Sequence, residues 1–180
     1  MKTVYDSGFK IEKVDHNFNY QNNLTQKLDN YSQPFNQETI NEIVLWKVNR
    51  YSELSENTIT LINQIGKNWD LELTRDVIGA LIREKGIQLP MASTILRFKN
   101  PNNYQIIDQR VYRIIYGIDL KLNQYKSEIN IKNQIDLYLN YLKDLRIIST
   151  KLNIPFDQAD RILYNTDKRL NNTVKLKNYG

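Results

Sequence analysis

From Gln37 onwards, apolar residues recur at helical spacing, and each run ends at a residue that interrupts helices. The first run, 37–50, has an apolar stripe so wide that its helix is expected to be largely buried. The next run begins after Ser55, which can cap a helix, and stops at Gly66. A third run begins after Asp70 and carries apolar residues at steps of three and four. These runs predict three successive helices.

The second half of the chain continues the same pattern. Asp108 begins a run that Gly117 stops, a long amphipathic run spans Ile131 to Leu152, and Pro155 lies near the start of a last helix. The segment 1–35 has no clean period, but its aromatic residues predict an extended segment with one short helix that packs on the body. No strand pattern and no repeat is present. The chain is therefore expected to have an all-α fold of about seven or eight helices.

Composition narrows the class of protein. The length of 180 residues fits one domain or two closely packed halves, and 41% hydrophobic with 25% charged residues is typical of a soluble globular protein. The apolar runs are too short to span a membrane, and the N-terminus lacks the hydrophobic core of a signal peptide. We therefore expect a cytoplasmic protein with no membrane partner.

The residue types present also limit the chemistry. There is no cysteine, which excludes disulfides, thiolate catalysis, cysteine-bound zinc and iron–sulfur clusters. The single histidine, His16, cannot build a histidine metal site or a catalytic triad. The net charge of +5 and the pI near 9.2 favour an anionic partner, nucleic acid above all. Carboxylates, hydroxyls, lysines and backbone dipoles remain as candidate functional groups.

The segment 85–94 has the features of a turn between two helices. Gly86 suits the left-handed residue at the end of one helix, and Pro90 suits the first turn of the next. Free backbone N–H groups near this helix start can bind a phosphate, and hydroxyl or cationic side chains that follow can reinforce the binding. The N–H groups expected to do so belong to Gly86, Ile87, Gln88 and Leu89, and the side chains to Ser93, Arg97 and Lys99.

This hairpin, the loop after it and the aspartate that opens the next helix resemble the core of the helix-hairpin-helix base-excision DNA glycosylases. In that family the hairpin commonly reads Leu-Pro-Gly-Val-Gly, followed by two residues and Thr-Ala. Without gaps, the two glycines fall on Gly86 and Gln88, and Thr-Ala falls on Met91-Ala92. The family's aspartate falls on Asp108, 22 positions after Gly86, which is the usual separation. The resemblance covers roughly residues 40–117.

The resemblance implies a compact all-α protein in which 36–117 forms a helical core with the hairpin and the Asp108 helix. The C-terminal region, 118–180, would be a helical lobe that completes a bilobal arrangement. Asp108 would be the catalytic carboxylate, stabilising positive charge on the sugar and orienting or deprotonating a water. The family's lyase lysine falls on Pro90, so Schiff-base chemistry is excluded and a monofunctional enzyme is implied.

The resemblance further implies double-stranded DNA as the partner and a monomeric, cytoplasmic protein, nucleoid-associated in a bacterium. It leaves room for a monovalent cation at the hairpin but implies no iron–sulfur cluster and no zinc. Arg110, beside the aspartate, could contact a phosphate or be solvated. An extruded base needs an aromatic or apolar pocket. The candidates nearest the motif are Trp46, Trp69, Tyr104, Tyr112 and Tyr116.

Several alternatives stay open at the level of sequence. Asp108 is also well suited to capping a helix, and the hairpin could be a plain corner between helices. The two tryptophans could be core residues, and Tyr112 and Tyr116, at i and i+4, could simply stack on one helix face. The protein could accordingly be a non-catalytic DNA-binding module. It could also be a helical partner-binding protein that uses the stripe at 131–152 as its interface.

Overall fold

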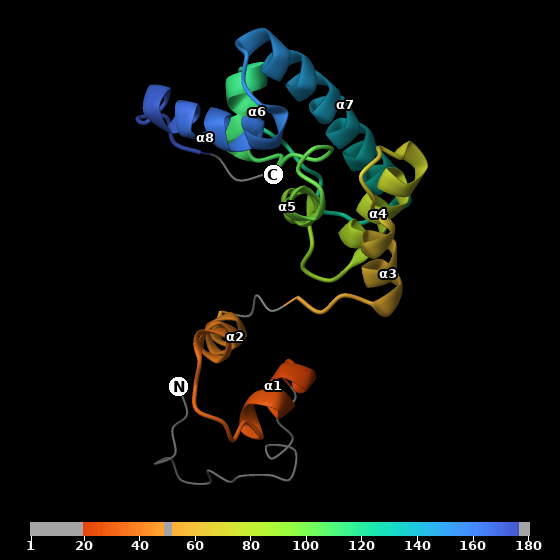
Figure 1. Cartoon of the computed structure of the whole chain (residues 1–180), viewed down its shortest axis with the longest axis vertical. Coiled ribbons are helices and arrows are strands. Elements are labelled where there is room, and N and C mark those ends of the chain that lie inside the picture. Colours follow the sequence, from red (N-terminus) through yellow and green to blue (C-terminus); the bar gives the residue numbers. More distant parts are fainter. Residues whose placement is uncertain (1–19, 49–51, 177–180) are drawn as a thin grey trace, which may run out of the picture. The chain divides into compact units, whose positions relative to one another are not determined.

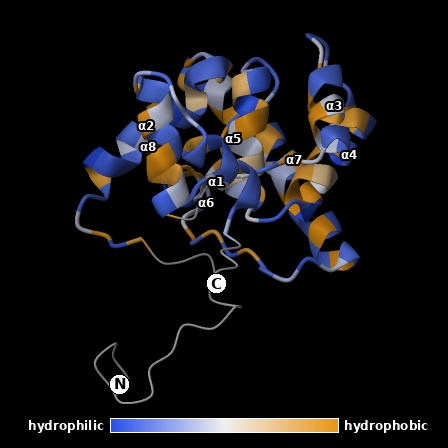
Figure 2. Cartoon of the chain, turned by 90° about the horizontal axis from the view of Figure 1, so that it is seen from below, coloured by the Kyte–Doolittle hydropathy of each residue, from blue (hydrophilic) through white to orange (hydrophobic). Residues whose placement is uncertain are grey.

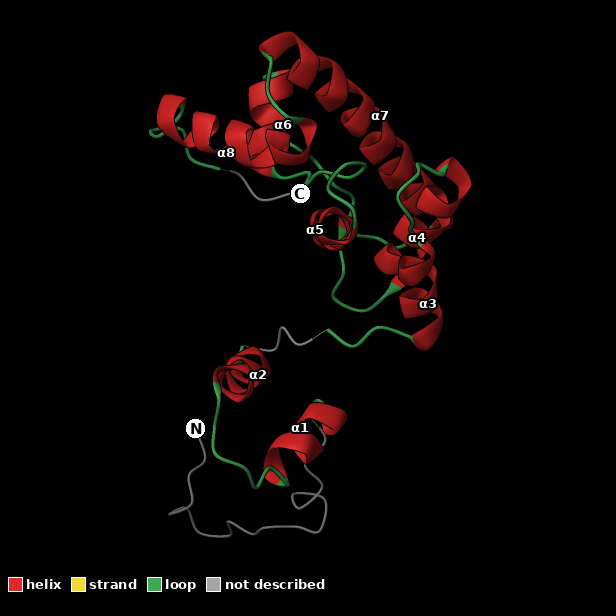
Figure 3. Cartoon of the chain, viewed as in Figure 1, coloured by secondary structure: helices red, strands yellow, loops and turns green. Residues whose placement is uncertain are grey.

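The computed structural model describes residues 20–48 and 52–176, and every regular element in those ranges is helical (Figures 1 and 3). Eight α-helices and one short 3₁₀ helix are present there, which confirms the predicted all-α fold of seven or eight helices. Each labelled helix in Figure 2 carries both hydrophobic and hydrophilic residues, as amphipathic helices do. The chain divides into two units, 1–51 and 52–180.

The first unit contains α1 (Asn22–Asp29) and α2 (Gln37–Lys47), which pack on each other. The indole Nε1 of Trp46 donates to Thr25 Oγ1 at 2.9 Å, and its ring meets that of Tyr20 edge to face at 5.2 Å. The short helix expected within 1–35 is therefore present as α1. Residues 1–19 of the predicted extended segment lie outside the described residues.

The apolar stripe of α2 is not buried as predicted. Thr39 is the buried residue of this helix, because the eight-residue α1 is too short to cover the stripe within this unit. The large apolar side chains that remain exposed on and just after α2 are Ile40, Val44, Leu45 and Val48. Stripe width alone therefore gave a wrong prediction of burial for this helix.

The second unit contains the remaining elements, which follow one another through short loops. Their bounds are α3 (Glu56–Gln64), α4 (Leu71–Arg83), α5 (Leu89–Lys99), α6 (Gln109–Tyr116), α7 (Glu128–Leu152), η2 (Phe156–Gln158) and α8 (Ala159–Leu170). Four of the α-helices begin with a side chain that accepts the N–H three residues further on, which stabilises the first turn. These capping residues are Ser55, Asp70, Asp108 and Ser127. The capping roles predicted for the first two are confirmed.

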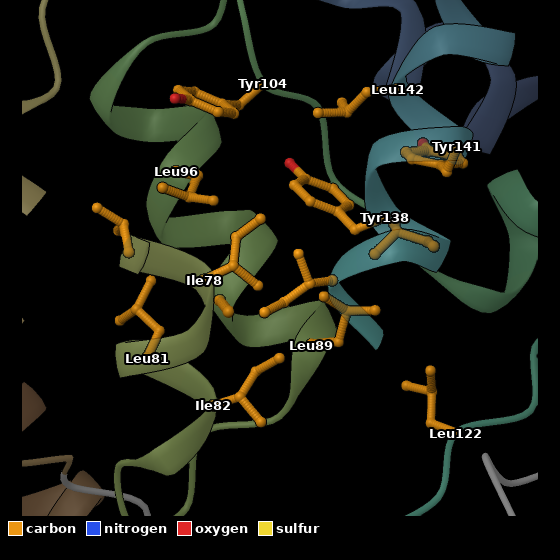
Figure 4. Packing of buried hydrophobic residues seen from close by; sticks show 14 of the residues in the cluster. Ile78, Leu81, Ile82, Leu89, Leu96, Tyr104, Leu122, Tyr138, Tyr141 and Leu142 are labelled. Carbon is orange, nitrogen blue, oxygen red and sulfur yellow. The ribbon is translucent and has the colours of Figure 1, made fainter. Parts of the chain in front are cut away.

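One hydrophobic core joins the helices of the second unit. α4 packs against α3, α5 and α7, while α6 packs against α8. Figure 4 shows Ile78 and Ile82 from α4 facing Leu89 from α5 and Tyr138 from α7. α2, which follows the predicted boundary at 35/36, packs with α1, and the helices after the predicted boundary at 117/118 share the core of α4 and α5.

The stripe of α7 belongs to this core. Ile131, Ile135, Leu142 and Leu145 are buried, so the stripe is not the free interface that the partner-binding hypothesis required. The face is covered because α4 and the segment before α6 lie against it. That part of the hypothesis is corrected by the structure.

Two buried tyrosines of α7 fix the loop that leads to α6. The hydroxyl of Tyr138 donates to the carbonyl of Gln105 at 2.9 Å, and that of Tyr141 donates to the carbonyl of Ile106 at 2.6 Å. Burial raises the pKa of both phenols well above their usual range, so they remain donors at neutral pH. The loop carbonyls just before Asp108 are thereby held by α7.

Glu84, at the end of α4, holds the start of α3. Its Oε1 accepts hydrogen bonds from the backbone N–H of Ser55 at 3.0 Å and from the hydroxyls of Ser55 and Thr58, both at 2.6 Å. The hydroxyls of Ser55 and Thr58 are the main cause that holds the pKa of Glu84 below its ordinary value of 4.5. The charged form of this carboxylate is the one that the fold favours.

We expect the Glu84→Gln variant to be less stable than the wild type at neutral pH, with the difference shrinking in acid. A carboxylate with a lowered pKa in the folded state stabilises above its unfolded pKa, and this contribution is lost as the pH falls through the folded pKa. Urea unfolding of both proteins at about pH 7 and about pH 3 measures the difference. A difference that stays the same at both values would contradict the role of the charge.

Candidate functional site

The predicted hairpin lies between α4 and α5. Gly86 has φ of 80°, the left-handed conformation that the sequence predicts there. Gln88, which occupies the position of the family's second glycine, is extended (φ −117°, ψ 168°) and forms the N-cap of α5. A side chain is therefore accommodated at 88 without backbone strain.

The backbone groups of this turn are only partly available to a ligand. The N–H of Ile87 donates to the carbonyl of Glu84 at 3.3 Å, so it is not the free donor that was expected. The side chains of Ile87 and Leu89 are buried in the core and anchor the turn. Gln88 and Leu89 stand at the N-terminus of α5, where backbone N–H groups have no partner within the helix.

Ser93 was predicted to reinforce phosphate binding, but the structure gives it an internal role. The side chain is fully buried, its hydroxyl donates to the carbonyl of Pro90 at 2.8 Å, and it accepts the N–H of Ile107 at 3.2 Å. It therefore joins α5 to the loop that carries Asp108, and it is not exposed to a ligand.

Arg97 is also internal, contrary to the prediction. It is 5% exposed, donates to the carbonyl of Asp157 at 3.0 Å, and places Nε 3.8 Å from the carboxylate of Asp160. The hydrogen bond to Asp157 and the nearby carboxylate of Asp160 occupy the guanidinium, so it is not free to bind a phosphate. Lys99 is exposed instead, and its Nζ donates to the side chain of Asn63 at 3.2 Å.

Arg110 takes part in an ion-pair network rather than standing free beside the aspartate. Its Nη1 donates to Asp167 Oδ2 at 3.0 Å, and Arg113 donates to both oxygens of the same carboxylate at 2.7 Å. Asp167 is fully buried on α8. Burial alone would raise the pKa of Asp167, but the hydrogen bonds from Arg113, Asn171 and Arg110 outweigh it and hold the pKa below its ordinary value.

Asp108 caps α6 and at the same time faces a pocket. Its Oδ1 accepts the N–H of Val111 at 2.8 Å, while the side chain remains half-buried. Burial is the main cause that raises the pKa of Asp108 above its ordinary value, and the negative charge of Asp160 adds to it. The backbone hydrogen bonds from Val111 and Arg110 oppose the shift without cancelling it. The carboxylate is therefore held in a poorly solvated position despite its cap.

The pocket beside Asp108 is open and has a volume of about 370 Å³. Its wall is formed by the loop before α6 and by one face of α8. The lining residues are Ile106, Asp108, Asp160, Arg161, Tyr164 and Asn165. The ring of Tyr164 is flanked by the cations of Arg110 at 5.6 Å and Lys168 at 5.8 Å.

The contributions of α8 to this pocket were missed in the sequence. Arg161, Tyr164 and Asn165 follow Asp108 by more than fifty positions, and only the packing of α8 on α6 brings them together. Their spacing of three and four places them on one face of the final helix, which was the available signal. No local motif connects that face to Asp108.

None of the aromatic residues predicted for a base pocket lines the pocket beside Asp108. Trp46 belongs to the first unit, whereas Asp108 belongs to the second. Tyr112 and Tyr116 stack on each other with ring centroids 4.5 Å apart, as the alternative interpretation had it.

The other predicted aromatic residues have partners elsewhere in the second unit. The hydroxyl of Tyr116 donates to Asp144 Oδ2 at 2.8 Å, and burial is the main cause that raises its pKa. Trp69 and Tyr104 pack on each other with centroids 5.6 Å apart, and they line a different hollow next to the α3–α4 loop. Tyr164 is therefore the aromatic residue that the structure places beside Asp108.

In residues 20–48 and 52–176, no group of three or more histidine, aspartate or glutamate side chains could hold a metal ion. No helix in these ranges is both long enough and apolar enough to cross a bilayer. No protein-family model, curated protein or solved structure matches the chain.

Proposed function

We propose that this chain is a monofunctional DNA glycosylase that hydrolyses the bond between a damaged or modified base and deoxyribose in double-stranded DNA. The observation that carries the proposal is the Asp108 carboxylate, which lines an open pocket while burial raises its pKa. Its place at the start of α6, 22 positions after the left-handed Gly86, follows the order of the family that the sequence resembles.

The chemistry of this bond suits a poorly solvated carboxylate. As the base leaves, positive charge develops on the sugar, and a fixed negative charge in a partly desolvated position stabilises it more strongly than the same charge in bulk water. A raised pKa brings Asp108 closer to the operating pH, which favours its action as the base that takes a proton from the attacking water. The water oxygen bonds to the anomeric carbon as the C–N bond breaks, and the proton taken up by Asp108 balances the one that the departing nucleobase acquires from solvent.

The pocket offers contacts for an extruded base. Its volume of about 370 Å³ falls within the usual range of ligand pockets, roughly 300–1,000 Å³. Tyr164 can stack on a base, while Arg161 and Asn165 can form hydrogen bonds with its edge. Exposed cations on and near α8, such as Arg161 and Lys168, can pair with phosphates of the duplex, and the N–H groups at the start of α5 can add to this.

A non-catalytic DNA-binding role is the second candidate. It is favoured by the capping hydrogen bond that Asp108 accepts from the N–H of Val111, which explains an aspartate at this position without any catalytic role. The two candidates predict the same salt-sensitive binding to DNA. They differ in whether the carboxylate of Asp108 strengthens the binding of DNA that carries a positive charge at the sugar.

The test is binding to three duplexes that differ at one nucleotide: a cationic pyrrolidine abasic analogue, a neutral abasic analogue and an intact pair. We expect the wild type to prefer the cationic analogue and Asp108→Asn to lose that preference. Asp136→Asn is the matched control, because it removes the carboxylate of Asp136 on α7, which pairs with Arg75 on α4, and Asp136 does not line the pocket. Equal affinity for all three duplexes would support the non-catalytic role, and no binding to any would overturn both.

A further inference from the structure

The loop between α3 and α4 forms a second hollow surface, lined by residues other than those of the Asp108 pocket. This loop has a fixed shape. The side-chain amide of Asn100 donates to the carbonyl of Gly66 at 2.8 Å, and that of Asn103 donates to the carbonyl of Lys67 at 3.0 Å. Because Asn100 is itself buried, the loop is tied to the body of the second unit. A ligand that binds there meets a preformed surface.

The surface presents an aromatic ring to solvent. Trp69 is 42% exposed, and the buried ring of Tyr104 supports it at a centroid distance of 5.6 Å. The hydroxyl of Tyr104 is held by that of Thr74 at 2.8 Å, so the supporting ring is itself fixed. The hollow at Trp69 has a volume of about 310 Å³. A large aromatic side chain this exposed, on a rigid support, is available to stack against a flat ligand.

Cationic side chains lie next to the ring. Lys67 lines the hollow at Trp69 and also an adjoining hollow of about 350 Å³, which Lys99 lines as well. Within the described part of the chain, neither lysine forms an ion pair with a carboxylate, and Lys99 contacts the neutral side chain of Asn63. Asp70 also lines the first hollow as the cap of α4, so the two adjoining hollows together hold two lysines and one carboxylate. The local charge therefore favours an anion.

From this arrangement we infer that the α3–α4 loop is a binding site for a nucleotide of single-stranded DNA, with the base stacked on Trp69 and the adjacent phosphate at Lys67 and Lys99. An aromatic platform beside a cationic groove is how proteins hold single strands without reading their sequence. The amides of Asn68 and Asn102, which line the two hollows, can bond to base or sugar. The inference does not depend on the proposed hydrolysis, because no residue of the Asp108 pocket takes part.

The chain offers a direct reporter, because it has two tryptophans. In the Trp46→Phe variant, all tryptophan fluorescence comes from Trp69. Short thymidine oligonucleotides are expected to quench this fluorescence in a saturable way, because the base stacks on the indole. An oligomer of the same length with abasic sugars, which has the phosphates but no bases, is expected to bind more weakly and to quench little.

Substitutions at the surface test each part of the site with a fluorescently labelled oligonucleotide. We expect Trp69→Leu to weaken binding by about tenfold or more, whereas Trp69→Phe keeps most of it, since a ring is retained. Lys67→Gln and Lys99→Gln should each reduce the salt dependence by about one phosphate contact. The matched control is Lys132→Gln, which removes an exposed lysine of α7. Circular dichroism would verify that each variant is folded.

The outcomes separate this inference from the proposed function. Binding that survives in Asp108→Asn but falls in Trp69→Leu would support the site whether or not the chain is a glycosylase. Absence of quenching in Trp46→Phe would overturn the inference. Equal binding by the abasic oligomer, or equal losses in Lys132→Gln and Lys67→Gln, would also overturn it, because both indicate a diffuse charge effect without stacking.

Discussion

Asp167→Ala is expected to destabilise the protein by about 3–5 kcal/mol, the usual cost of removing one partner of a buried ion pair. Asp167 is fully buried and accepts two hydrogen bonds from Arg113 and one from Arg110. Without the carboxylate, the largely buried guanidinium of Arg113 loses the counter-charge to which it is hydrogen-bonded. The measurement is denaturant unfolding of the wild type and the variant at neutral pH.

The pH dependence gives this prediction a second readout. The pKa of Asp167 in the folded state lies below its ordinary value of 3.8, so its stabilising contribution is complete above that value and is lost as the pH falls through the folded pKa. The gap between wild type and Asp167→Ala should therefore narrow in strong acid. Asp136→Ala is the control, since its pair with Arg75 lies at the surface, with side chains 36% and 42% exposed, and such pairs are worth about 0–1 kcal/mol. Similar losses in the two variants would contradict the assignment of a buried network.

For Asp108→Asn we expect two opposite effects: hydrolysis falls by about 10²- to 10⁴-fold, while stability at neutral pH is kept or raised. The first part rests on the proposed function. The second rests on the raised pKa of Asp108, because an ionised carboxylate that burial disfavours costs stability above its folded pKa. Asparagine caps a helix about as well as aspartate, so the bond to Val111 N–H is retained. Single-turnover assays and thermal unfolding measure the two effects.

The stability of the wild type should depend on pH through the carboxylate of Asp108. With a folded pKa above 3.8, the wild type loses stability as the pH rises from that value through the folded pKa. The advantage of Asp108→Asn should therefore appear over this window and vanish below it. Asp108→Ala, which also lacks the cap, should be less stable than Asp108→Asn by about 1 kcal/mol. If the wild type is more stable than Asp108→Asn at neutral pH, the negative charge of Asp108 stabilises the fold through capping, and the predicted cost of burying that charge is wrong.

Local signals in the sequence were enough for the helices and their ends. Ser55, Asp70 and Gly86 act within a few residues of themselves, through caps or a left-handed backbone, so their positions could be read directly. The existence of the pocket could not be read in this way. It depends on the packing of α8 against α6, which no short-range pattern specifies.

Long-range packing also explains why two arginines that were predicted to contact phosphates lie inside ion pairs. Arg97 and Arg110 are of a residue type that often contacts phosphates. In the structure, each is paired with a carboxylate more than fifty positions later in the chain. Sequence spacing gives no information on such partners. Burial of α2 was predicted wrongly for a related reason, because the width of an apolar stripe does not say whether a partner of sufficient length exists in the same unit.

The loop before α6 has no freedom to act as a hinge. Tyr138 and Tyr141 donate to its carbonyls, while Ser93 and Asp160 accept its N–H groups, so α5, α7 and α8 together constrain the three residues that precede Asp108. Opening this loop would require breaking buried hydrogen bonds in the core of the second unit. The backbone that carries the Asp108 carboxylate is therefore fixed. A substrate must change its own conformation to reach the carboxylate. If the substrate is a DNA duplex, the duplex would have to bend and unstack. Sites with a low energy of deformation would then be the best substrates.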